Sequence, residues 1–198
     1  MSKEIKTSFY SEEELKELGF KYIGKNVKVS RYARIYKPEV ISIGDYSRID
    51  DFSILSGGKG VAIGRFCHIS CFSCIFAGAG VEFGDFSGVS GGVCVYSESD
   101  DFSGKSLAGP AIPIEFKTHY KSKPVVIGRH VLVGPQTVIL PGVTLAEGVA
   151  IGAQSLVTRS CRKPWSQYMG SPARYFVARS NNALQLEKEF LKTLEDQE

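Results

Sequence analysis

The stretch IGRHVL VGPQTV ILPGVT LAEGVA IGAQSL V, residues 127–157, repeats every six residues. An aliphatic residue opens each block, and a small or β-branched residue stands four places later. This period matches neither the 3.6 residues of a helical turn nor the alternation of an ordinary strand. It is typical of a parallel β-helix, in which each block forms one face of a triangular coil.

The aliphatic column continues toward the N-terminus in steps of six, six and eight residues. Members of one face therefore stand twenty residues apart, namely Ile23, Ile43, Ile63 and Phe83. We predict coils of twenty residues that shorten to eighteen after Ile127. Stacked coils bury a continuous column, and each buried Ile or Leu contributes about 1.5–3 kcal/mol. Glycine holds the second place of many blocks, where we expect tight corners.

The repeat divides the chain into three segments. Residues 1–22 precede the coils, and Ser11 with Glu14 forms a capping box that predicts a short helix, Glu12 to Leu18, over the first coil. Residues 23–162 form the β-helix. Residues 163–198 hold a turn and a helix from about Asn181 to Glu195. That helix either caps the last coil or contacts a neighbouring subunit.

An excursion of about thirty residues, 97–126, interrupts the repeat. It lacks the six-residue phase and contains Pro110, Pro113 and Pro124. A long irregular excursion from a regular scaffold is usually functional or disordered. The scaffold resumes in phase at Ile127, so we predict an ordered arm that reaches away from the coils.

Two rows of large aromatic residues recur at fixed places in the blocks, where side chains should point outward. One row is Tyr46, Phe66 and Phe86, with His130 next in line; the other is Tyr32, Phe52 and Phe72. Exposed aromatic stripes of this size usually mark an interface. We therefore expect an oligomer, unless the helices or the arm of the same chain cover these rows.

Composition favours one soluble domain. The chain has 198 residues, 43% of them hydrophobic, and no apolar run approaches the roughly 20 residues of a membrane span. The N-terminus, MSKEIKTSFYSEEEL, lacks the apolar core of a signal peptide, which indicates the cytoplasm. A net charge of +3 without a basic run gives no sign of nucleic-acid binding.

The five cysteines are expected to be free thiols. Cys67, Cys71 and Cys74 are close enough in sequence to suggest a zinc site. However, Cys67 falls in the small core column, and the three occupy different places in their blocks. We therefore predict no metal site.

The block IGAQSLVT, followed by GSPARYF, resembles the hexapeptide-repeat acyltransferases, and the likeness extends along the whole chain. The nearest group is similar to the sugar O- and N-acetyltransferases of bacterial surface-polysaccharide synthesis. The resemblance implies a left-handed parallel β-helix and a homotrimer with acyl-CoA sites between subunits. It also implies acetyl-CoA as co-substrate and a sugar or nucleotide-linked sugar as acceptor.

The resemblance carries the cofactor site onto particular residues. Members of the family bind the CoA arm through the last coils and a basic residue near the end of the chain. The matching positions here are Ala153, Thr158, Arg159 and Arg174. Pantetheine amides suit an exposed strand edge, and the phosphates of CoA suit arginine.

The catalytic base is the main departure from that family. In related branches a histidine stands near the start of the excursion, where this chain reads SESDDFSG. Acyl transfer benefits from a base that is active near neutral pH, which favours histidine. The chain offers His68, His119 and His130.

His68 is our first candidate for the base. It should project outward at a corner beside Gly88, and Asp50 of the previous coil can reach it and set its tautomer. His119 lies in the arm, where a residue could cross to another subunit, whereas His130 can simply pack in its aromatic row.

Asp100 and Asp101 also remain candidates. They can bind the sugar, orient the base or act as the base, although Ser-Asp-Asp-Phe-Ser-Gly is also favourable turn sequence.

Two other functions fit the same scaffold. A γ-class carbonic anhydrase shares the β-helix but needs three histidines on one metal ion, and the spacing of His68, His119 and His130 does not favour that. A non-catalytic trimeric binding scaffold would not need the IGAQSLVT block or Arg174. An acyltransferase is the function that the sequence favours.

Overall fold

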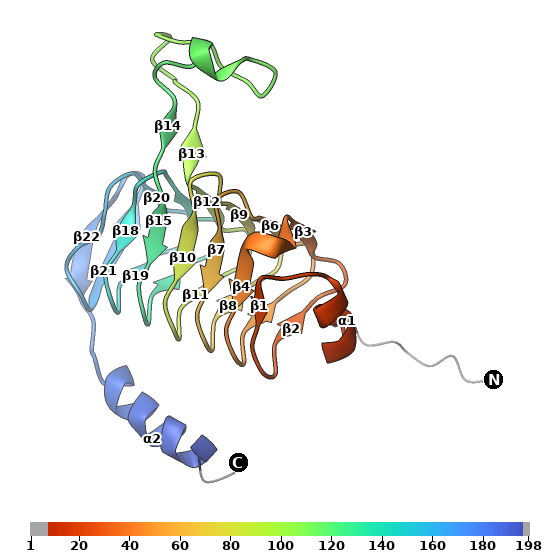
Figure 1. The fold of residues 1–198 in the computed structure, drawn as a ribbon. Coiled ribbons are helices and arrows are strands. Elements are labelled where there is room, and N and C mark those ends of the chain that lie inside the picture. Colours follow the sequence, from red (N-terminus) through yellow and green to blue (C-terminus); the bar gives the residue numbers. More distant parts are fainter. Residues whose placement is uncertain (1–7, 196–198) are drawn as a thin grey trace.

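Each six-residue block forms one short strand and one corner, as the repeat predicts. The structure is a computed structural model that describes residues 8–195. It shows a parallel β-helix, consistent with the left-handed winding that the resemblance implies, with an arm, a short N-terminal helix and a C-terminal helix (Figure 1). The outer ends of the predicted terminal segments, residues 1–7 and 196–198, lie outside the described residues.

Three parallel sheets form the faces of the coil. Face 1 contains β1 (Tyr22–Ile23), β4 (Ile41–Ile43), β7 (Val61–Ile63), β10 (Val81–Phe83), β15 (Val125–Ile127) and β18 (Thr144–Leu145). Face 2 contains β2 (Lys28–Val29), β5 (Arg48–Ile49), β8 (His68–Ile69), β11 (Gly88–Val89), β16 (Leu132–Val133), β19 (Ala150–Ile151), β21 (Ser166–Gly170) and β22 (Ala173–Ala178). Face 3 contains β3 (Arg34–Tyr36), β6 (Ile54–Ser56), β9 (Cys74–Phe76), β12 (Cys94–Tyr96), β17 (Val138–Ile139) and β20 (Leu156–Val157).

The strand register confirms the predicted coil lengths. Ile43 pairs with Ile63, and Ile63 with Phe83, so each coil advances by twenty residues. After the arm, Ile127 pairs with Leu145, a step of eighteen. These side chains are at most 4% exposed and form one continuous core along the solenoid.

We expected the glycines at the second place of many blocks to form the tight corners, but the structure gives them another role. The left-handed backbone conformation at the corner between faces 1 and 2 is held by aromatic residues: φ is +58° at Tyr46, +55° at Phe66 and +58° at Phe86. Gly44 instead lies where the next coil comes close, because a Cβ there would stand 2.7 Å from the backbone of Gly64. The glycines at the second place of a block therefore allow close stacking of coils. The corners are made mostly by other residues, although Gly92, Gly142 and Gly148 hold later corners in the same left-handed conformation.

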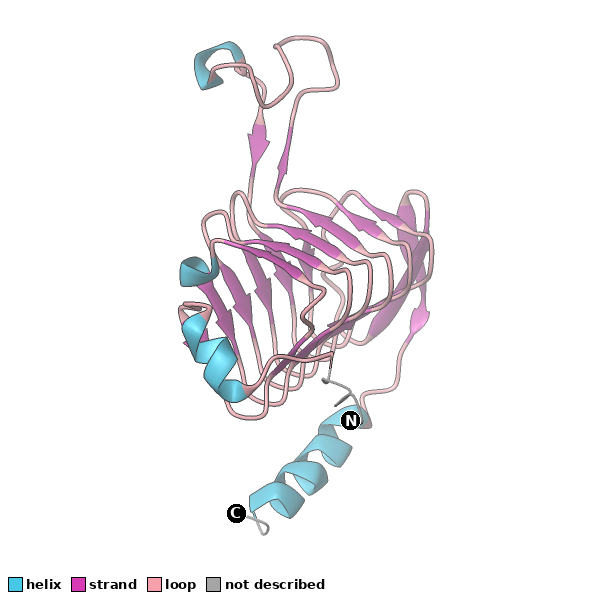
Figure 2. Ribbon diagram, turned by 90° about the vertical axis from the view of Figure 1, so that its right-hand side faces the viewer, coloured by secondary structure: helices cyan, strands magenta, loops and turns pink. Residues whose placement is uncertain are grey.

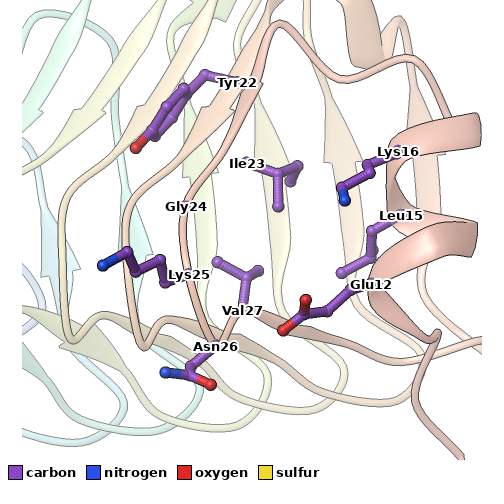
Figure 3. A pocket seen from close by; sticks show the side chains of 9 residues that line it. All are labelled: Glu12, Leu15, Lys16, Tyr22, Ile23, Gly24, Lys25, Asn26 and Val27. Atoms are coloured by element: carbon purple, nitrogen blue, oxygen red, sulfur yellow. The ribbon is translucent and has the colours of Figure 1, made fainter. Parts of the chain in front are cut away.

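The N-terminal helix α1 (Glu12–Glu17) begins at the predicted capping box, since Ser11 and Glu14 make both of its reciprocal bonds. Leu15 is only 1% exposed and lies over the open end of the first coil. Figure 3 shows Leu15 pointing toward Ile23 and Val27 across a pocket of about 440 Å³. The helix thus covers the first coil, as predicted.

The excursion is an ordered arm, as the sequence predicts. Its base is the antiparallel pair β13 (Glu98–Ser99) and β14 (Lys121–Ser122), and a short 3₁₀ helix, η2 (Ile114–Phe116), lies farther out. The Glu98 carboxylate accepts hydrogen bonds from the hydroxyls of Tyr120 (3.0 Å) and Ser122 (2.8 Å), which tie the two strands together. Figures 1 and 2 show the arm standing clear of the coils. A second 3₁₀ helix, η1 (Pro38–Val40), lies between β3 and β4.

The C-terminal segment holds a hairpin in place of the expected turn. Its helix, expected either to cap the last coil or to contact a neighbouring subunit, packs against its own chain. A hairpin of β21 and β22 extends face 2 beyond the last coil, with β21 pairing to β19. Helix α2 (Ala183–Glu195) does not cap that coil but runs back beside the corner between faces 1 and 2 (Figure 1). Within residues 8–195, neither α-helix has the length and hydropathy needed to cross a bilayer.

Candidate active site

The first aromatic row is covered by the chain's own helix. Rings of Tyr46, Phe66, Phe86 and His130 stack at centroid distances of 4.9, 4.7 and 5.3 Å along the corner between faces 1 and 2. Phe190 of α2 packs edge-on against Phe66 at 5.3 Å. We call this row the covered ladder. We expected this row either to form an oligomer interface or to be covered by the same chain, and the structure supports cover by a helix of the same chain.

Glu187 fastens α2 to this ladder. Its carboxylate is 5% exposed and accepts hydrogen bonds from Arg129 and from the Nε2 of His130, the latter at 2.7 Å. Burial alone would raise the pKa of Glu187, but the bonds from Arg129 and His130 outweigh it and lower the pKa. His130 is therefore a buried structural partner, in agreement with the packing role considered for it.

The second aromatic row remains open to solvent in the single chain. Tyr32, Phe52 and Phe72 line the corner between faces 2 and 3. The rings of Tyr32 and Phe52 are tilted at a centroid distance of 5.8 Å, and those of Phe52 and Phe72 stack at 5.2 Å. Their exposed fractions are 60%, 54% and 61%. We call this row the exposed ladder. No element among residues 8–195 covers it to the extent that α2 covers the first row.

An open groove lies on the outer surface of face 2, with a volume of about 440 Å³. Small residues form its floor, because Gly88 stands between His68 and Leu132 in the strand register. Ser70 and Ser90 are also part of its lining. The groove brings our first candidate base, His68, to a surface where an extended ligand can lie.

His68 has the carboxylate partner that the sequence predicts. Its Nε2 lies 2.7 Å from Oδ2 of Asp50, whose Oδ1 accepts a bond from Nε of Arg48 at 2.5 Å. The His68 side chain is 50% exposed and that of Asp50 only 16%. Burial opposes ionisation of Asp50, but the bonds from Arg48 and His68 outweigh it and lower its pKa. An ionised Asp50 favours the imidazole tautomer that carries its proton on Nε2, which leaves Nδ1 free to accept one.

The aspartates proposed from the sequence lie on the arm. Asp100 forms an ion pair with Lys117 at 2.8 Å and accepts the backbone N–H of Gly109 at 3.0 Å. These two contacts lower the pKa of Asp100. Asp100 is therefore ionised and held in place by other residues of the arm.

Asp101 organises the arm's own turn. Its carboxylate accepts the backbone N–H and hydroxyl of Ser103 and the backbone N–H groups of Lys105 and Ser106. The bonds from Ser103, followed by those from Lys105 and Ser106, lower the pKa of Asp101 to about 2. A role for Asp101 in sugar binding stays a prediction, although these bonds already occupy its oxygens.

His119 also lies on the arm, and its Nδ1 is 3.1 Å from the hydroxyl of Thr118. The three histidines therefore belong to different places: His68 to face 2, His119 to the arm, and His130 to the covered ladder. Among the described residues, no group of three or more His, Cys, Asp or Glu side chains is placed to hold a metal ion. The carbonic anhydrase alternative is not favoured.

The residues assigned to CoA cluster at the C-terminal end of the solenoid. Ala153 precedes β20 and Thr158 and Arg159 follow it, and all three are exposed. Strand β20 stands at the end of face 3. Binding of a pantetheine arm along its outer edge stays a prediction. Arg174 lies on the exposed strand β22, at the far end of face 2 from His68.

Comparison with known proteins shows which family this chain belongs to. Residues 124–159 match the model of the bacterial transferase hexapeptide (six repeats). A dTDP-4-amino-4,6-dideoxy-D-glucose acyltransferase of Escherichia coli is 39% identical over 184 residues, which span 92% of this chain and 95% of that protein.

The solved structures include AntD, an N-acyltransferase from Bacillus cereus in complex with dTDP-4-amino-4,6-dideoxyglucose and coenzyme A. It is 46% identical, with a TM-score of 0.91 over 94% of this chain and 99% of AntD. Other AntD structures contain dTDP with 3-hydroxybutyryl-CoA, at a TM-score of 0.91 over 96% of this chain and 99% of AntD. Variants of AntD have been solved at one serine and at one aspartate ten positions further along its chain.

Proposed function

Because the chain belongs to the hexapeptide-repeat family of bacterial transferases, and is an acyl-CoA-dependent sugar acyltransferase, we propose that its acceptor is a dTDP-linked 4-amino-4,6-dideoxyglucose. The observation that carries this proposal is the full-length likeness to AntD, which binds that nucleotide sugar together with coenzyme A. The acylated sugar would serve surface-polysaccharide synthesis.

For this reaction the protein must align the sugar amine with the thioester and provide one group that accepts a proton. The sugar amine attacks the thioester carbonyl carbon, the C–S bond breaks, and CoA leaves as the thiol with the proton that nitrogen gives up. His68, with Asp50 behind it, is our proposed first acceptor of that proton, which it then passes to the sulfur of the leaving CoA. Because the amine is itself a good nucleophile, the loss of the histidine found near the excursion in related branches is compatible with activity.

Ser90 is a further proposed site residue, and the sequence reasoning missed it. The only serine and aspartate in this chain that stand ten positions apart, serine first, are Ser90 and Asp100. The same spacing separates the two residues substituted in AntD. Ser90 lines the groove beside His68, which supports a role near the reacting atoms. Asp100, rather than Asp101, is then the arm carboxylate that we assign to the acceptor.

The cofactor is proposed to run along the C-terminal coils. Ala153 and Thr158 flank the free edge of β20, and Arg159 and Arg174 would pair with the phosphates of CoA. Acetyl-CoA is the donor expected from the sequence, and AntD in complex with 3-hydroxybutyryl-CoA makes a longer acyl chain the alternative.

A homotrimer is proposed as the working assembly. The exposed ladder supports it, since three large aromatic rings open to water are typical of an interface. Sedimentation should give three times the mass of the chain, and a clean monomer at micromolar concentration would contradict it. We also place the reaction in the cytoplasm, which agrees with five cysteines that are all free thiols in the structure.

An acceptor panel tests the proposed function. The purified protein is given acetyl-CoA or 3-hydroxybutyryl-CoA with dTDP-4-amino-4,6-dideoxyglucose, and release of the CoA thiol is followed. The matched control is the same nucleotide sugar with a hydroxyl in place of the amine. We expect turnover with the amino sugar and none with its hydroxyl analogue. Equal rates on the two acceptors would overturn the N-acyltransferase assignment.

A further inference from the structure

A pocket of about 330 Å³ separates part of helix α2 from the coils. Phe86 and Leu132 line it from the coils, and Leu186 and Phe190 line it from the helix. We call it the helix pocket. Leu132, Leu186 and Phe190 are 49%, 56% and 42% exposed, although large apolar side chains are more stable when they are buried. The chain therefore leaves an apolar surface open at this place.

The polar side chains around the helix pocket are already used by the protein. Glu187 accepts a bond from Arg129 on one carboxylate oxygen and a bond from His130 on the other. Nη1 of Arg179 donates to the backbone oxygens of His130 and Gly148, at 3.0 and 2.9 Å. What remains for a ligand is mostly carbon surface. The pocket therefore suits an aliphatic ligand, since a polar one would lose its bonds to water there without replacing them.

The helix pocket is continuous with the groove that holds His68, because Phe86 and Leu132 line both of them. In the strand register Gly88 stands between His68 and Leu132. Adjacent strands are about 4.8 Å apart, so a group placed over Gly88 is one strand from His68 on one side and one strand from Leu132 on the other. Gly88 has no side chain to separate them. A ligand that lies over Gly88 can therefore reach both the proposed base and the pocket.

We propose that the helix pocket binds the acyl chain of the CoA thioester. The thioester carbonyl stands over Gly88 within reach of His68, and the carbon chain passes Leu132 into the pocket. The CoA arm enters from the other end of the groove, which Ala150 and Ile151 line near the C-terminal coils. The inference rests on the proposed placement of the reaction beside His68.

The length of the acyl chain decides whether it uses the pocket. An extended chain advances about 1.2 Å per bond, so a chain of four carbons comes into contact with Leu132, whereas an acetyl group ends short of it. A methylene group is about as large as a water molecule, which takes up roughly 30 Å³, so a pocket of about 330 Å³ has room for several. Each methylene that becomes buried should raise the affinity roughly fourfold. The donor is therefore a thioester of four or more carbons in preference to acetyl-CoA.

A series of donors tests the pocket without any acceptor sugar. Binding of acetyl-CoA, butyryl-CoA and hexanoyl-CoA to the unaltered protein is measured by calorimetry. We expect Kd to fall roughly tenfold from acetyl-CoA to butyryl-CoA, and to fall again for hexanoyl-CoA, because two methylenes are added at each step. Equal Kd values along the series would overturn the proposal.

A matched pair of variants assigns the effect to the helix pocket. Leu186→Trp fills the pocket at a position that is 56% exposed, so the fold should survive, and the ratio of the acetyl-CoA Kd to the hexanoyl-CoA Kd should fall toward one. Lys188→Trp adds the same side chain at an exposed position of α2 that does not line the pocket, and should keep the ratio. Because the readout is a ratio, the lost charge of Lys188 cancels. An unchanged ratio in Leu186→Trp, or an equal fall in both variants, would contradict the assignment.

Fluorescence of the unaltered chain gives a test that needs no variant. Trp165 is the only tryptophan, and its ring centroid lies 5.6 Å from that of His130, which lines the helix pocket. Bromine quenches tryptophan emission only at close range. Saturating 6-bromohexanoyl-CoA should therefore quench Trp165 more strongly than saturating hexanoyl-CoA. Equal emission with the two ligands would place the chain elsewhere and overturn the proposal.

These measurements separate the helix pocket from the proposed acceptor, because no sugar is present. A chain-length preference that Leu186→Trp removes, in a protein that does not acylate dTDP-4-amino-4,6-dideoxyglucose, would support the pocket and count against the acceptor alone. Acylation of that amino sugar with a chain-length preference that Leu186→Trp leaves intact would count against the pocket alone.

Discussion

His68→Ala is expected to lower kcat by roughly 10²–10⁴, the usual contribution of a positioned general base. That range corresponds to about 2.7–5.5 kcal/mol of activation free energy. The expectation comes from the bond between His68 and Asp50, 2.7 Å long, on the wall of a groove that also holds Ser90. Without the imidazole, the proton of the attacking amine must pass to water or to CoA.

Folding should survive this substitution. The His68 side chain is 50% exposed and its neighbour in the next coil is Gly88, so little packing is lost. Asp50 loses one partner but keeps Arg48 at 2.5 Å, which leaves its charge paired. We expect a change in the free energy of unfolding below about 1 kcal/mol, as for other half-exposed ion pairs.

The assay follows release of the CoA thiol with saturating acyl-CoA and amino sugar, and CoA binding is measured separately by calorimetry. CoA affinity should be nearly unchanged, because the proposed contacts of the cofactor lie at β20 and Arg174. His119→Ala serves as the control, and Asp50→Asn should give a smaller loss than His68→Ala. A His68→Ala enzyme within a few-fold of wild type would refute the assignment, and His119 and Asp100 would then be the next candidates.

Three further outcomes are expected. Arg174→Ala should weaken CoA binding by about 1.5–3 kcal/mol, the range for a charge-assisted bond, and leave the melting temperature unchanged; full affinity would move the phosphate site to Arg159. Glu187→Gln should loosen α2 and lower the free energy of unfolding by about 1.5–3 kcal/mol, because the charge that holds Arg129 and His130 is lost; an unchanged denaturation midpoint would contradict this. The pKa of Asp101 measured by NMR should be about 2. Because this pKa lies below the ordinary value of an aspartate, the bonds to Asp101 stabilise the arm above roughly pH 4, and that stabilisation is lost as the pH falls toward 2. A titration midpoint near 4 would show that the bonds do not form.

The repeat made the solenoid predictable because each inward residue obeys one spacing rule. The pairing of Ile43 with Ile63 and of Ile127 with Leu145 follows directly from the steps of twenty and eighteen. The same spacing predicts that Asp50, one coil earlier, can reach His68, as the structure shows. Residues on adjacent coils are neighbours in space, so sequence spacing alone carries contact information in this fold.

The C-terminal segment was less predictable because it leaves the repeat. The strands of the β21–β22 hairpin have mostly exposed or half-buried side chains and no six-residue phase, so nothing in the pattern distinguished them from a turn. The apolar face of α2 was visible, but not the surface it contacts. Glu187, a carboxylate within that face, was the available signal that the helix meets a basic partner rather than a purely apolar one.

Ser90 could not be found from the repeat, because it stands at an outward place where many residue types are tolerated. Its proposed role rests on the groove that it lines and on the spacing that it and Asp100 share with two substituted residues of AntD. Asp100 is a candidate that the sequence offers, and its role in binding the acceptor stays a prediction.

We propose that this protein forms an amide on a nucleotide-linked amino sugar with an acyl group taken from CoA. The most direct test is NMR of the product formed from acyl-CoA and dTDP-4-amino-4,6-dideoxyglucose by the purified protein. We expect an acyl group on the nitrogen at C4, with one equivalent of free CoA released. An ester on a sugar hydroxyl, or CoA release without any acylated sugar, would contradict it.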